Sequence, residues 1–322
     1  MLSEFDLIAR FFTRKPRDGG SVALGVGDDC ALLSVPAGET LAVSTDMLVE
    51  GRHFFAGADP EALGHKALAV NLSDLAAMGA RPLGFTLALA LPAAEADWLA
   101  AFARGLLGLA DAHGIELMGG DTTRGPLNLC ITVMGSVPLG SALRRDRAAV
   151  GDEIWVSGTL GDARLALEAL LGTQSLSTVE FERAAWRLHR PEPRVALGLA
   201  LRGIANAAID VSDGLLGDLG HILAGSGVGA TVDADALPCG ASLALQPASL
   251  RRDFALNGGD DYELCFTAPG DRHDAVRSAA AQAGVQVTRI GRIEHERGLR
   301  LVDAAGGTLA VASRSFDHFA NP

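Results

Sequence analysis

The chain has 322 residues, of which 48% are hydrophobic, so it is long enough for about two folded domains and is not a disordered polypeptide. Its 27 basic and 39 acidic residues give a formal net charge of -12, which argues against nucleic acid as a partner, because phosphate-backbone binding needs clustered lysine and arginine. The four cysteines are isolated from one another, which disfavours a zinc ribbon or a redox pair. The most apolar stretch, residues 83–94, is too short to span a bilayer, and we expect a cytoplasmic protein with no membrane contact.

The N-terminal half alternates between strand-like and helix-like patterns. Period-two alternation between glycine and proline residues indicates strands, and apolar residues at helical spacing indicate helices. The predicted elements are strands at residues 22–33 and 41–46, a helix at 61–78, a strand at 83–91, a helix at 94–112 and a strand at 128–137.

A basic seam near residues 138–152 separates this half from a second one of similar style. We expect a domain boundary there, with one domain at residues 1–140 and another at 150–322. The predicted elements of the second half are strands at 153–157, 207–211, 229–233, 261–267 and 285–293, and helices at 162–171, 193–205, 214–224 and 271–283. Strands that alternate with helices predict an α/β class with α+β layers.

The aspartates are informative by position, and most of them stand at the ends of these strands or in glycine-flanked turns, where α/β folds bind ligands. They are Asp28, Asp29, Asp46, Asp74, Asp121, Asp210, Asp213, Asp260 and Asp261. For any single aspartate a turn or helix-cap role is the simpler explanation. Asp74 differs, because it falls inside an apolar helix between Leu72 and Leu75 and there requires a cation or a strong donor.

If these carboxylates converge, they require cations, because two like charges 4 Å apart repel by about 4 kcal/mol at an effective dielectric near 20. Oxygen ligands select Mg²⁺ or Ca²⁺, and the sequence has no calcium-loop pattern. Magnesium usually completes its shell with water and phosphate oxygens, which points to a nucleotide. No P-loop or protein-kinase motif occurs, so we expect metals and helix N-termini near Asp162 and Asp213 to hold the phosphates.

Several blocks, in order along nearly the whole chain, resemble the thiamine-monophosphate kinase family. The blocks are Gly27–Ala31, Ser44–Val49, Asn71–Ala80, Gly119–Gly125, Asp210–Leu215, Gly258–Leu264 and Phe316–Phe319. The resemblance implies the two-domain fold of the aminoimidazole ribonucleotide synthetase-like superfamily. It also implies a homodimer formed through the sheet of the N-terminal domain. Two positions depart from the family pattern, since Asp260 stands where Glu is common and Phe316 where Tyr or Trp is frequent.

The resemblance also implies the reaction, which is transfer of the γ-phosphoryl group of ATP to thiamine monophosphate with several Mg²⁺ ions. No residue is needed as a general base. The implied metal ligands are Asp29, Ser44, Thr45, Asp46, Asp74, Asp121, Asp210 and Asp213. The implied ATP contacts are Gly120, Asp121, Arg145 and Ser212, and the implied substrate contacts are His53, Asp260 and Phe316.

Two alternatives stay open at this point. One is another ATP-dependent enzyme of the same superfamily, such as one like aminoimidazole ribonucleotide synthetase or selenophosphate synthetase. The absence of cysteine from residues 1–24 disfavours the latter. The other alternative is a non-catalytic protein that binds metal or nucleotide, which the complete set of aspartates disfavours.

Overall fold

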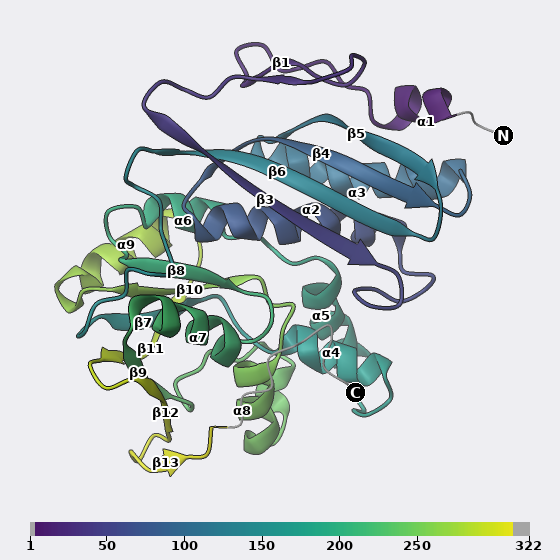
Figure 1. Ribbon diagram of the computed structural model, residues 1–322. Helices are drawn as coiled ribbons and strands as arrows, with labels where there is room; N and C mark the ends of the chain where they lie inside the picture. Colours follow the sequence, from purple (N-terminus) through teal and green to yellow (C-terminus); the bar gives the residue numbers. More distant parts are fainter. Residues whose placement is uncertain (1–3, 312–322) are drawn as a thin grey trace. The chain divides into compact units, whose positions relative to one another are not determined.

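The computed structural model describes residues 4–311 and divides them into two compact units (Figure 1). The first unit holds the residues up to Leu75 together with Ala80–Gly140, and the second holds Ala76–Gly79 and the residues from Ser141 onward. Both units combine helices with a sheet, as the α/β prediction requires.

The first unit is built on a four-stranded sheet in the order β3-β6-β4-β5. Strands β3 and β4 pair antiparallel with β6, and β4 and β5 run parallel, with a helix as the crossover between them. Its elements are α1 (Glu4–Phe11), β1 (Val22–Leu24), β2 (Leu32–Leu33), β3 (Glu39–Val49), α2 (Pro60–Ala77), β4 (Arg81–Leu91), α3 (Ala96–His113), β5 (Glu116–Arg124) and β6 (Asn128–Pro138).

Helices α2 and α3 lie behind this sheet in Figure 1, and the opposite face of the sheet is turned towards the viewer. The core between helices and sheet is formed by fully buried side chains such as Leu68, Leu72, Phe102, Phe85 and Ile131. The strands therefore alternate between buried residues on the helix side and more exposed residues on the other side.

Two N-terminal features differ from the sequence expectation. The region at 22–33 is two short strands joined by a loop, not one strand, and the acidic pair Asp28–Asp29 lies in that loop. Strand β5 is missing from the prediction, because Gly119-Gly120 and the polar residues after them show no apolar alternation. The segment is a strand because its backbone pairs in parallel with β4, and its side chains give no sign of this pairing in the sequence.

The second unit contains a seven-stranded sheet in the order β13-β12-β9-β11-β7-β10-β8, antiparallel except where β12 pairs with β9. Its strands are β7 (Glu153–Ser157), β8 (Ala207–Val211), β9 (Gly229–Asp233), β10 (Glu263–Ala268), β11 (Val287–Glu294), β12 (Gly298–Val302) and β13 (Thr308–Leu309). Its helices are α4 (Asp162–Leu170), α5 (Thr178–His189), α6 (Val195–Ala200), α7 (Leu215–Ser226), α8 (Ala248–Asn257) and α9 (His273–Gln282), with short 3₁₀ turns η1 (Leu243–Leu245) and η2 (Gly270–Arg272).

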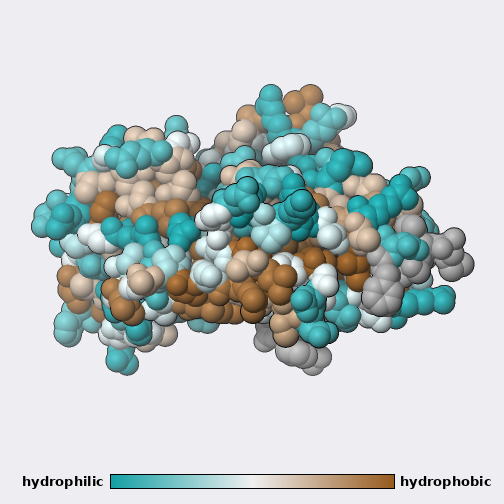
Figure 2. Space-filling view, turned by 90° about the horizontal axis from the view of Figure 1, so that it is seen from above, coloured by the Kyte–Doolittle hydropathy of each residue, from teal (hydrophilic) through white to brown (hydrophobic). Residues whose placement is uncertain are grey.

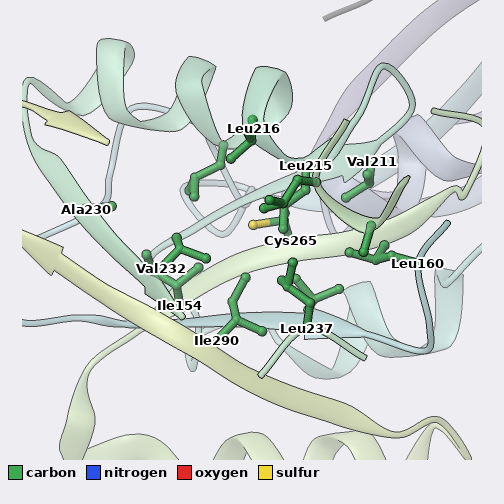
Figure 3. Close-up of a cluster of buried hydrophobic side chains, with 14 of the residues drawn as sticks. Ile154, Leu160, Val211, Leu215, Leu216, Ala230, Val232, Leu237, Cys265 and Ile290 are labelled. Carbon is green, nitrogen blue, oxygen red and sulfur yellow. The ribbon is translucent and has the colours of Figure 1, made fainter. Parts of the chain in front are cut away.

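The main core of this unit lies between the sheet and helices α7 and α8. Figure 3 shows Ile154 and Val211 from the strands meeting Leu215 and Leu216 from α7 around Cys265. On the other side of the sheet Trp155 stacks on Phe266, with ring centroids 6.5 Å apart, and contacts the ring of His273 at the start of α9. Because both faces of the sheet are covered, β7, β8 and β10 are buried along nearly their whole length and show no alternation of buried and exposed residues.

Helices α4 and α5 form a small separate cluster, with Ala163 and Ala166 packed against Ala184 and Leu188. The sequence analysis does not predict α5, although a capping box marks its start. The Ser177 hydroxyl accepts from the Glu180 amide, and the Glu180 carboxylate accepts from the Ser177 amide. Within residues 4–311, no helix has both the length and the apolar character needed to cross a bilayer.

Candidate active site

In the first unit, the polar residues of β3 and α2 meet on the helix side of the sheet. The Ser44 hydroxyl donates a short hydrogen bond to Oδ2 of Asp74. Two residues along β3, the amide of Asp46 donates to Oδ1 of Asn71, one turn before Asp74 in α2, at 3.1 Å. Ser44 and Asp74 thus present oxygen atoms at one place, and Asp46 lies on the same sheet face two residues along β3. The strong donor that an aspartate inside an apolar helix requires is Ser44.

Thr45 takes part in a different contact. Side chains alternate along a strand, so Thr45 lies on the sheet face opposite to Ser44 and Asp46. Its hydroxyl is 2.8 Å from the hydroxyl of Thr132 on β6. Its side chain therefore does not join the oxygen atoms of Ser44 and Asp74.

Gly120 and Asp121 lie on β5, at the far edge of the sheet from β3. The register aligns Asp46 with Gly120 in one row, through β6 and β4. Three strand spacings separate the ends of that row, or about 14 Å. The structure therefore does not bring Asp121 to Asp46 within one chain.

Gly120 has its own structural reason to be glycine. A Cβ atom built on it would lie 1.9 Å from the carbonyl oxygen of Leu87 on β4, and its φ is 153°. Any side chain would therefore push β5 away from β4. Gly120 and Asp121 are both exposed, so a ligand can reach β5 at this point.

The remaining candidates of the first unit lie in loops. Asp29 is exposed between β1 and β2, and its amide donates to the side chain of Asp28 at 2.8 Å. His53 follows β3 and is half-buried, and its Nδ1 accepts from the amide of Val49 at 3.0 Å. Because Nδ1 is an acceptor, the neutral ring carries its proton on Nε2, which is then a donor suited to a phosphate oxygen.

In the second unit, Asp210 is the penultimate residue of β8 and is buried, and Ser212 and Asp213 form the turn into α7. The carboxylate of Asp218, in the first turn of α7, accepts from the amides of both Ser212 and Asp213 at 3.1 Å. The sequence analysis expects the helix N-terminus near Asp213 to bind phosphate. In the structure the amides of this turn instead donate to the carboxylate of Asp218. Asp162 likewise directs its carboxylate to the amide of Leu243 at 2.8 Å.

Arg145 is connected electrostatically to this turn. Burial raises the pKa of Asp218 to about 7, and the neighbouring Asp213 carboxylate adds to the rise. The amides of Asp213 and Ser212 and the positive charge of Arg145 act in the opposite direction on that pKa. Arg145 is itself exposed, and its carbonyl accepts from the hydroxyl of Ser226 at the end of α7 at 3.1 Å.

The loop that carries Asp260 packs directly on this turn. The amide of Asp260 donates to the carbonyl of Ser212, and the amide of Tyr262 donates to the carbonyl of Val211, both at 2.9 Å. At Gly259 a Cβ atom would lie 2.4 Å from the Ser212 carbonyl oxygen, so only glycine permits this approach. Two blocks that are far apart in sequence thus form one local structure.

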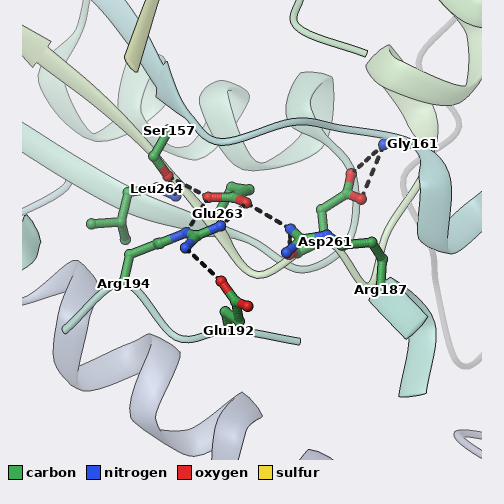
Figure 4. Close-up of polar contacts among 8 residues, drawn as sticks. All are labelled: Ser157, Gly161, Arg187, Glu192, Arg194, Asp261, Glu263 and Leu264. Atoms are coloured by element: carbon green, nitrogen blue, oxygen red, sulfur yellow. Dashed lines mark hydrogen bonds and ion pairs between the residues drawn. The ribbon is translucent and has the colours of Figure 1, made fainter. Parts of the chain in front are cut away.

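Buried charges hold the base of the same loop (Figure 4). Both carboxylate oxygens of Asp261 accept from the amide of Gly161, at 3.0 and 2.9 Å. Glu263, which is completely buried, accepts from Arg187, Arg194 and the Ser157 hydroxyl, each at 2.6 Å. Burial raises the pKa of Asp261 well above its usual range, against the hydrogen bond from Gly161 and the charge of Arg187.

Phe316 lies outside the described residues. Among residues 4–311, no group of three or more His, Cys, Asp or Glu side chains is assembled as a metal site. The donors that are present nevertheless fit magnesium, because each of the two units offers carboxylate and hydroxyl oxygens and no sulfur or imidazole among its candidate ligands. Magnesium commonly takes one or two carboxylates and fills its other positions with water and phosphate.

Sequence reasoning missed Asn71, Asp218, Tyr262 and the arginines around Glu263. Asn71 and Tyr262 stand inside the recognised blocks and could have been found there. Arg187 could have been placed through the capping box of α5. Nothing local in the sequence signals that Arg187 and Glu263, 76 positions apart, form a pair.

Comparisons with known proteins establish the family and the fold of this chain. The chain matches the models of the AIR synthase related protein N-terminal domain over residues 27–137 and C-terminal domain over residues 149–304. It is 47% identical to the thiamine-monophosphate kinase of Salmonella typhimurium over 324 residues, which cover 99% of each chain. The chain belongs to the thiamine-monophosphate kinase family.

Solved structures of thiamine-monophosphate kinases share the fold. The crystal structure of the enzyme from Stenotrophomonas maltophilia is 51% identical, covers 94% of this chain and 95% of its own, and superposes with a TM-score of 0.84. A structure described as AaThiL complexed with AMPPCP and TMP is 29% identical, covers 98% of this chain and 97% of its own, and has a TM-score of 0.77. The two-domain fold that the resemblance implies is thereby confirmed for this member of the thiamine-monophosphate kinase family.

Proposed function

We propose that this protein transfers the γ-phosphoryl group of ATP to thiamine monophosphate, which yields thiamine diphosphate and ADP. The observation that carries the proposal is the contact of Ser44 with Asp74 beside Asp46, in a chain whose family is established over its whole length. A relative that was crystallised with both AMPPCP and TMP supports the choice of the two substrates.

The nucleophile is an oxygen of the acceptor phosphate, which is largely ionised at pH 7 because the second pKa of a phosphate monoester is near 6. No protein base is needed. The barrier is the repulsion between two anionic phosphates, and the protein lowers it by positioning the substrates and balancing their charge. Magnesium, when bound, supplies the charge neutralisation that brings the two phosphates into line.

The protein's own residues divide this work between the units. In the first unit, Asp46 and Asp74 supply anionic oxygens, Ser44 fixes the orientation of Asp74, and His53 donates from Nε2 to the acceptor phosphate. We assign further metal-holding roles to Asp29 in the β1–β2 loop and to Asp121 on β5, with Gly120 next to Asp121 at the nucleotide, and to the backbone oxygen of Thr45, whose side chain lies on the opposite sheet face.

In the second unit, Arg145 contacts the phosphates of ATP, Ser212 contacts ATP, and Asp260 contacts the thiamine part of the acceptor. Asp210 and Asp213 supply further oxygens for magnesium. Phe316 completes the acceptor site, as the family resemblance implies.

We also propose that the protein is a homodimer in the cytoplasm. The face of the four-stranded sheet turned away from α2 and α3 carries large apolar side chains on β3, with Leu41, Val43 and Met47 exposed by 41%, 56% and 52%. Figure 2 shows that hydrophobic residues also gather at the surface when the molecule is viewed from above. A sheet face of this kind is stabilised when a second copy covers it.

The direct experiment incubates the purified protein with ATP, magnesium and thiamine monophosphate and quantifies both thiamine diphosphate and ADP. We expect the two products in equal amounts, and no ADP above background without the acceptor. ADP release that ignores thiamine monophosphate would instead favour another ATP-dependent enzyme of the superfamily. Binding of nucleotide without turnover would favour a non-catalytic protein.

A further inference from the structure

The loop that joins Gly259 to Glu263 contains two residues in an uncommon backbone conformation. Asp260 has φ 65° and Tyr262 has φ 50°, and no other residue within 4–311 except glycine has a positive φ. A left-handed conformation is unfavourable for a non-glycine residue, because its Cβ atom approaches the following carbonyl oxygen. Such conformations persist where the surrounding structure imposes them, and they cluster at functional sites.

The surroundings of this loop impose it from two sides. The amides of Asp260 and Tyr262 are hydrogen-bonded to the backbone of the β8–α7 turn. The side chains of Asp261 and Glu263 are buried in the hydrogen bonds and ion pairs shown in Figure 4. The loop is therefore anchored by the backbone of Asp260 and Tyr262 and by the side chains of Asp261 and Glu263. The side chains of Asp260 and Tyr262 remain half-buried at its surface.

These two side chains also contact each other. The Tyr262 hydroxyl donates to Oδ1 of Asp260 at 3.1 Å. A hydrogen bond to a carboxylate is stronger than one between neutral groups and fixes the orientation of the acid. The loop thus offers a negative charge and an aromatic ring side by side, which is the combination that binds a cationic heteroaromatic group.

We propose that Tyr262 determines specificity for the acceptor by holding Asp260 in place and offering its ring to the cationic thiamine moiety. The inference rests on the proposed function, because that function supplies an acceptor with a thiazolium cation and an aminopyrimidine. It assigns the acceptor's organic part, and not its phosphate, to this loop. The hydroxyl and the ring make separable contributions.

The kinetic test compares Tyr262→Phe, which removes the hydroxyl, with Tyr262→Leu, which also removes the ring. Loss of one hydrogen bond to a charged group predicts a KM for thiamine monophosphate that is about 10-fold higher in Tyr262→Phe. The KM for ATP should change less than about 2-fold, and Tyr262→Leu should raise the acceptor KM further. In an Asp260→Asn background, Tyr262→Phe should add little, because the two residues act as a unit.

A second measurement does not depend on turnover. Tyr262 is the only tyrosine of the chain, so protein labelled with fluorotyrosine gives a single fluorine NMR signal. Thiamine monophosphate alone, and thiamine alone, should shift this signal, whereas inorganic phosphate should not. The three tryptophans do not contribute to it.

The inference is overturned if saturating thiamine monophosphate leaves the fluorine signal in place, or if Tyr262→Phe leaves the acceptor KM unchanged. It is also overturned if inorganic phosphate reproduces the shift. Failure of the proposed function would look different, because the unsubstituted protein would then form no thiamine diphosphate. The two results are therefore distinguishable.

Discussion

The hydroxyl of Ser44 on β3 donates a hydrogen bond to the carboxylate of Asp74 on α2, and so ties the strand to the helix that covers it. The bond fixes the orientation of an acidic side chain on the sheet face that also carries Asp46. Asp74 is half-buried among apolar helix residues, where an ionised carboxylate needs such a donor or a cation. The same oxygens are suited to hold magnesium when the phosphates of the substrates are present.

Asp46→Asn should lower turnover strongly without unfolding the protein. Asparagine keeps the shape of the side chain but removes its charge, and loss of one preorganised electrostatic group lowers the rate by about 100-fold or more. The measurement is kcat for thiamine diphosphate formation, with circular dichroism as the check on folding. The matched control is Asp111→Asn, since Asp111 pairs with Arg14 and Arg17 on the surface of the same unit. Equal rates for Asp46→Asn and the unsubstituted protein would remove Asp46 from the site.

Glu263→Gln should destabilise the protein, because two arginines would lose the buried charge that compensates them. Removing one partner of a buried ion pair costs about 3–5 kcal/mol in the free energy of unfolding. Glu192 provides the control, since it also pairs with Arg194 but its side chain is 61% exposed. Glu192→Gln should cost no more than about 1 kcal/mol. Urea unfolding measures both, and similar losses in the two variants would contradict the role given to Glu263.

Asp162→Asn should change how stability depends on pH. Burial is the main cause that raises the pKa of Asp162 in the folded protein, so its contribution is fully present below the unfolded value near 3.9 and is lost as pH rises through the folded value. The unfolding free energy of the unsubstituted protein, minus that of Asp162→Asn, should therefore fall from about pH 4 upward.

Asp111 provides the opposite sign as a control for this experiment. Hydrogen bonds and charge from Arg14, together with those from Arg17, lower its pKa despite slight burial. Its contribution is present above the unfolded value and is lost as pH falls. The difference between the unsubstituted protein and Asp111→Asn should therefore rise with pH, and parallel slopes for the two variants would contradict the assignment.

Val43→Lys should weaken the proposed dimer. Val43 is 56% exposed on the sheet face away from α2 and α3, and a lysine there would bring two positive charges into an apolar interface. Leu171→Lys is the control, since Leu171 is 57% exposed at the end of α4 in the other unit. Sedimentation velocity should show monomer for Val43→Lys at concentrations where Leu171→Lys is dimeric. A monomeric unsubstituted protein would contradict the proposed interface.

Much of the fold was predictable, because its signals are local. The helix α2 follows from apolar spacing and a stop at Gly79, and β8 follows from the short, mostly apolar run Ala207–Val211. Strand β5 was not predictable in this way, because pairing with β4 holds a segment of glycine and polar residues in an extended form. Long-range pairing of this kind leaves no periodicity in the sequence.

Of the candidate site, the surroundings of Asp74 were predictable from the sequence, whereas the position of the Asp260 loop was not. The contact of Asp74 with a donor follows from the cost of burying a carboxylate in an apolar helix. The direct packing of the Asp260 loop on the Ser212 turn does not, since it results from sheet order and from the close approach at Gly259. The separation of Asp121 from Asp46 was not predictable, because it depends on the order of the strands in the sheet. The register places the two residues about three strand spacings, or about 14 Å, apart.

The most direct test of the central claim is the magnesium dependence of thiamine diphosphate formation in the unsubstituted protein and in Ser44→Ala and Asp74→Asn. The account predicts no product in the presence of a chelator and saturable recovery when magnesium is restored. It also predicts a magnesium requirement about 10- to 100-fold higher in Ser44→Ala, because a group that orients a ligand is lost, and little product at any concentration in Asp74→Asn. Undiminished product formation in the chelator, or identical magnesium curves for all three proteins, would contradict it.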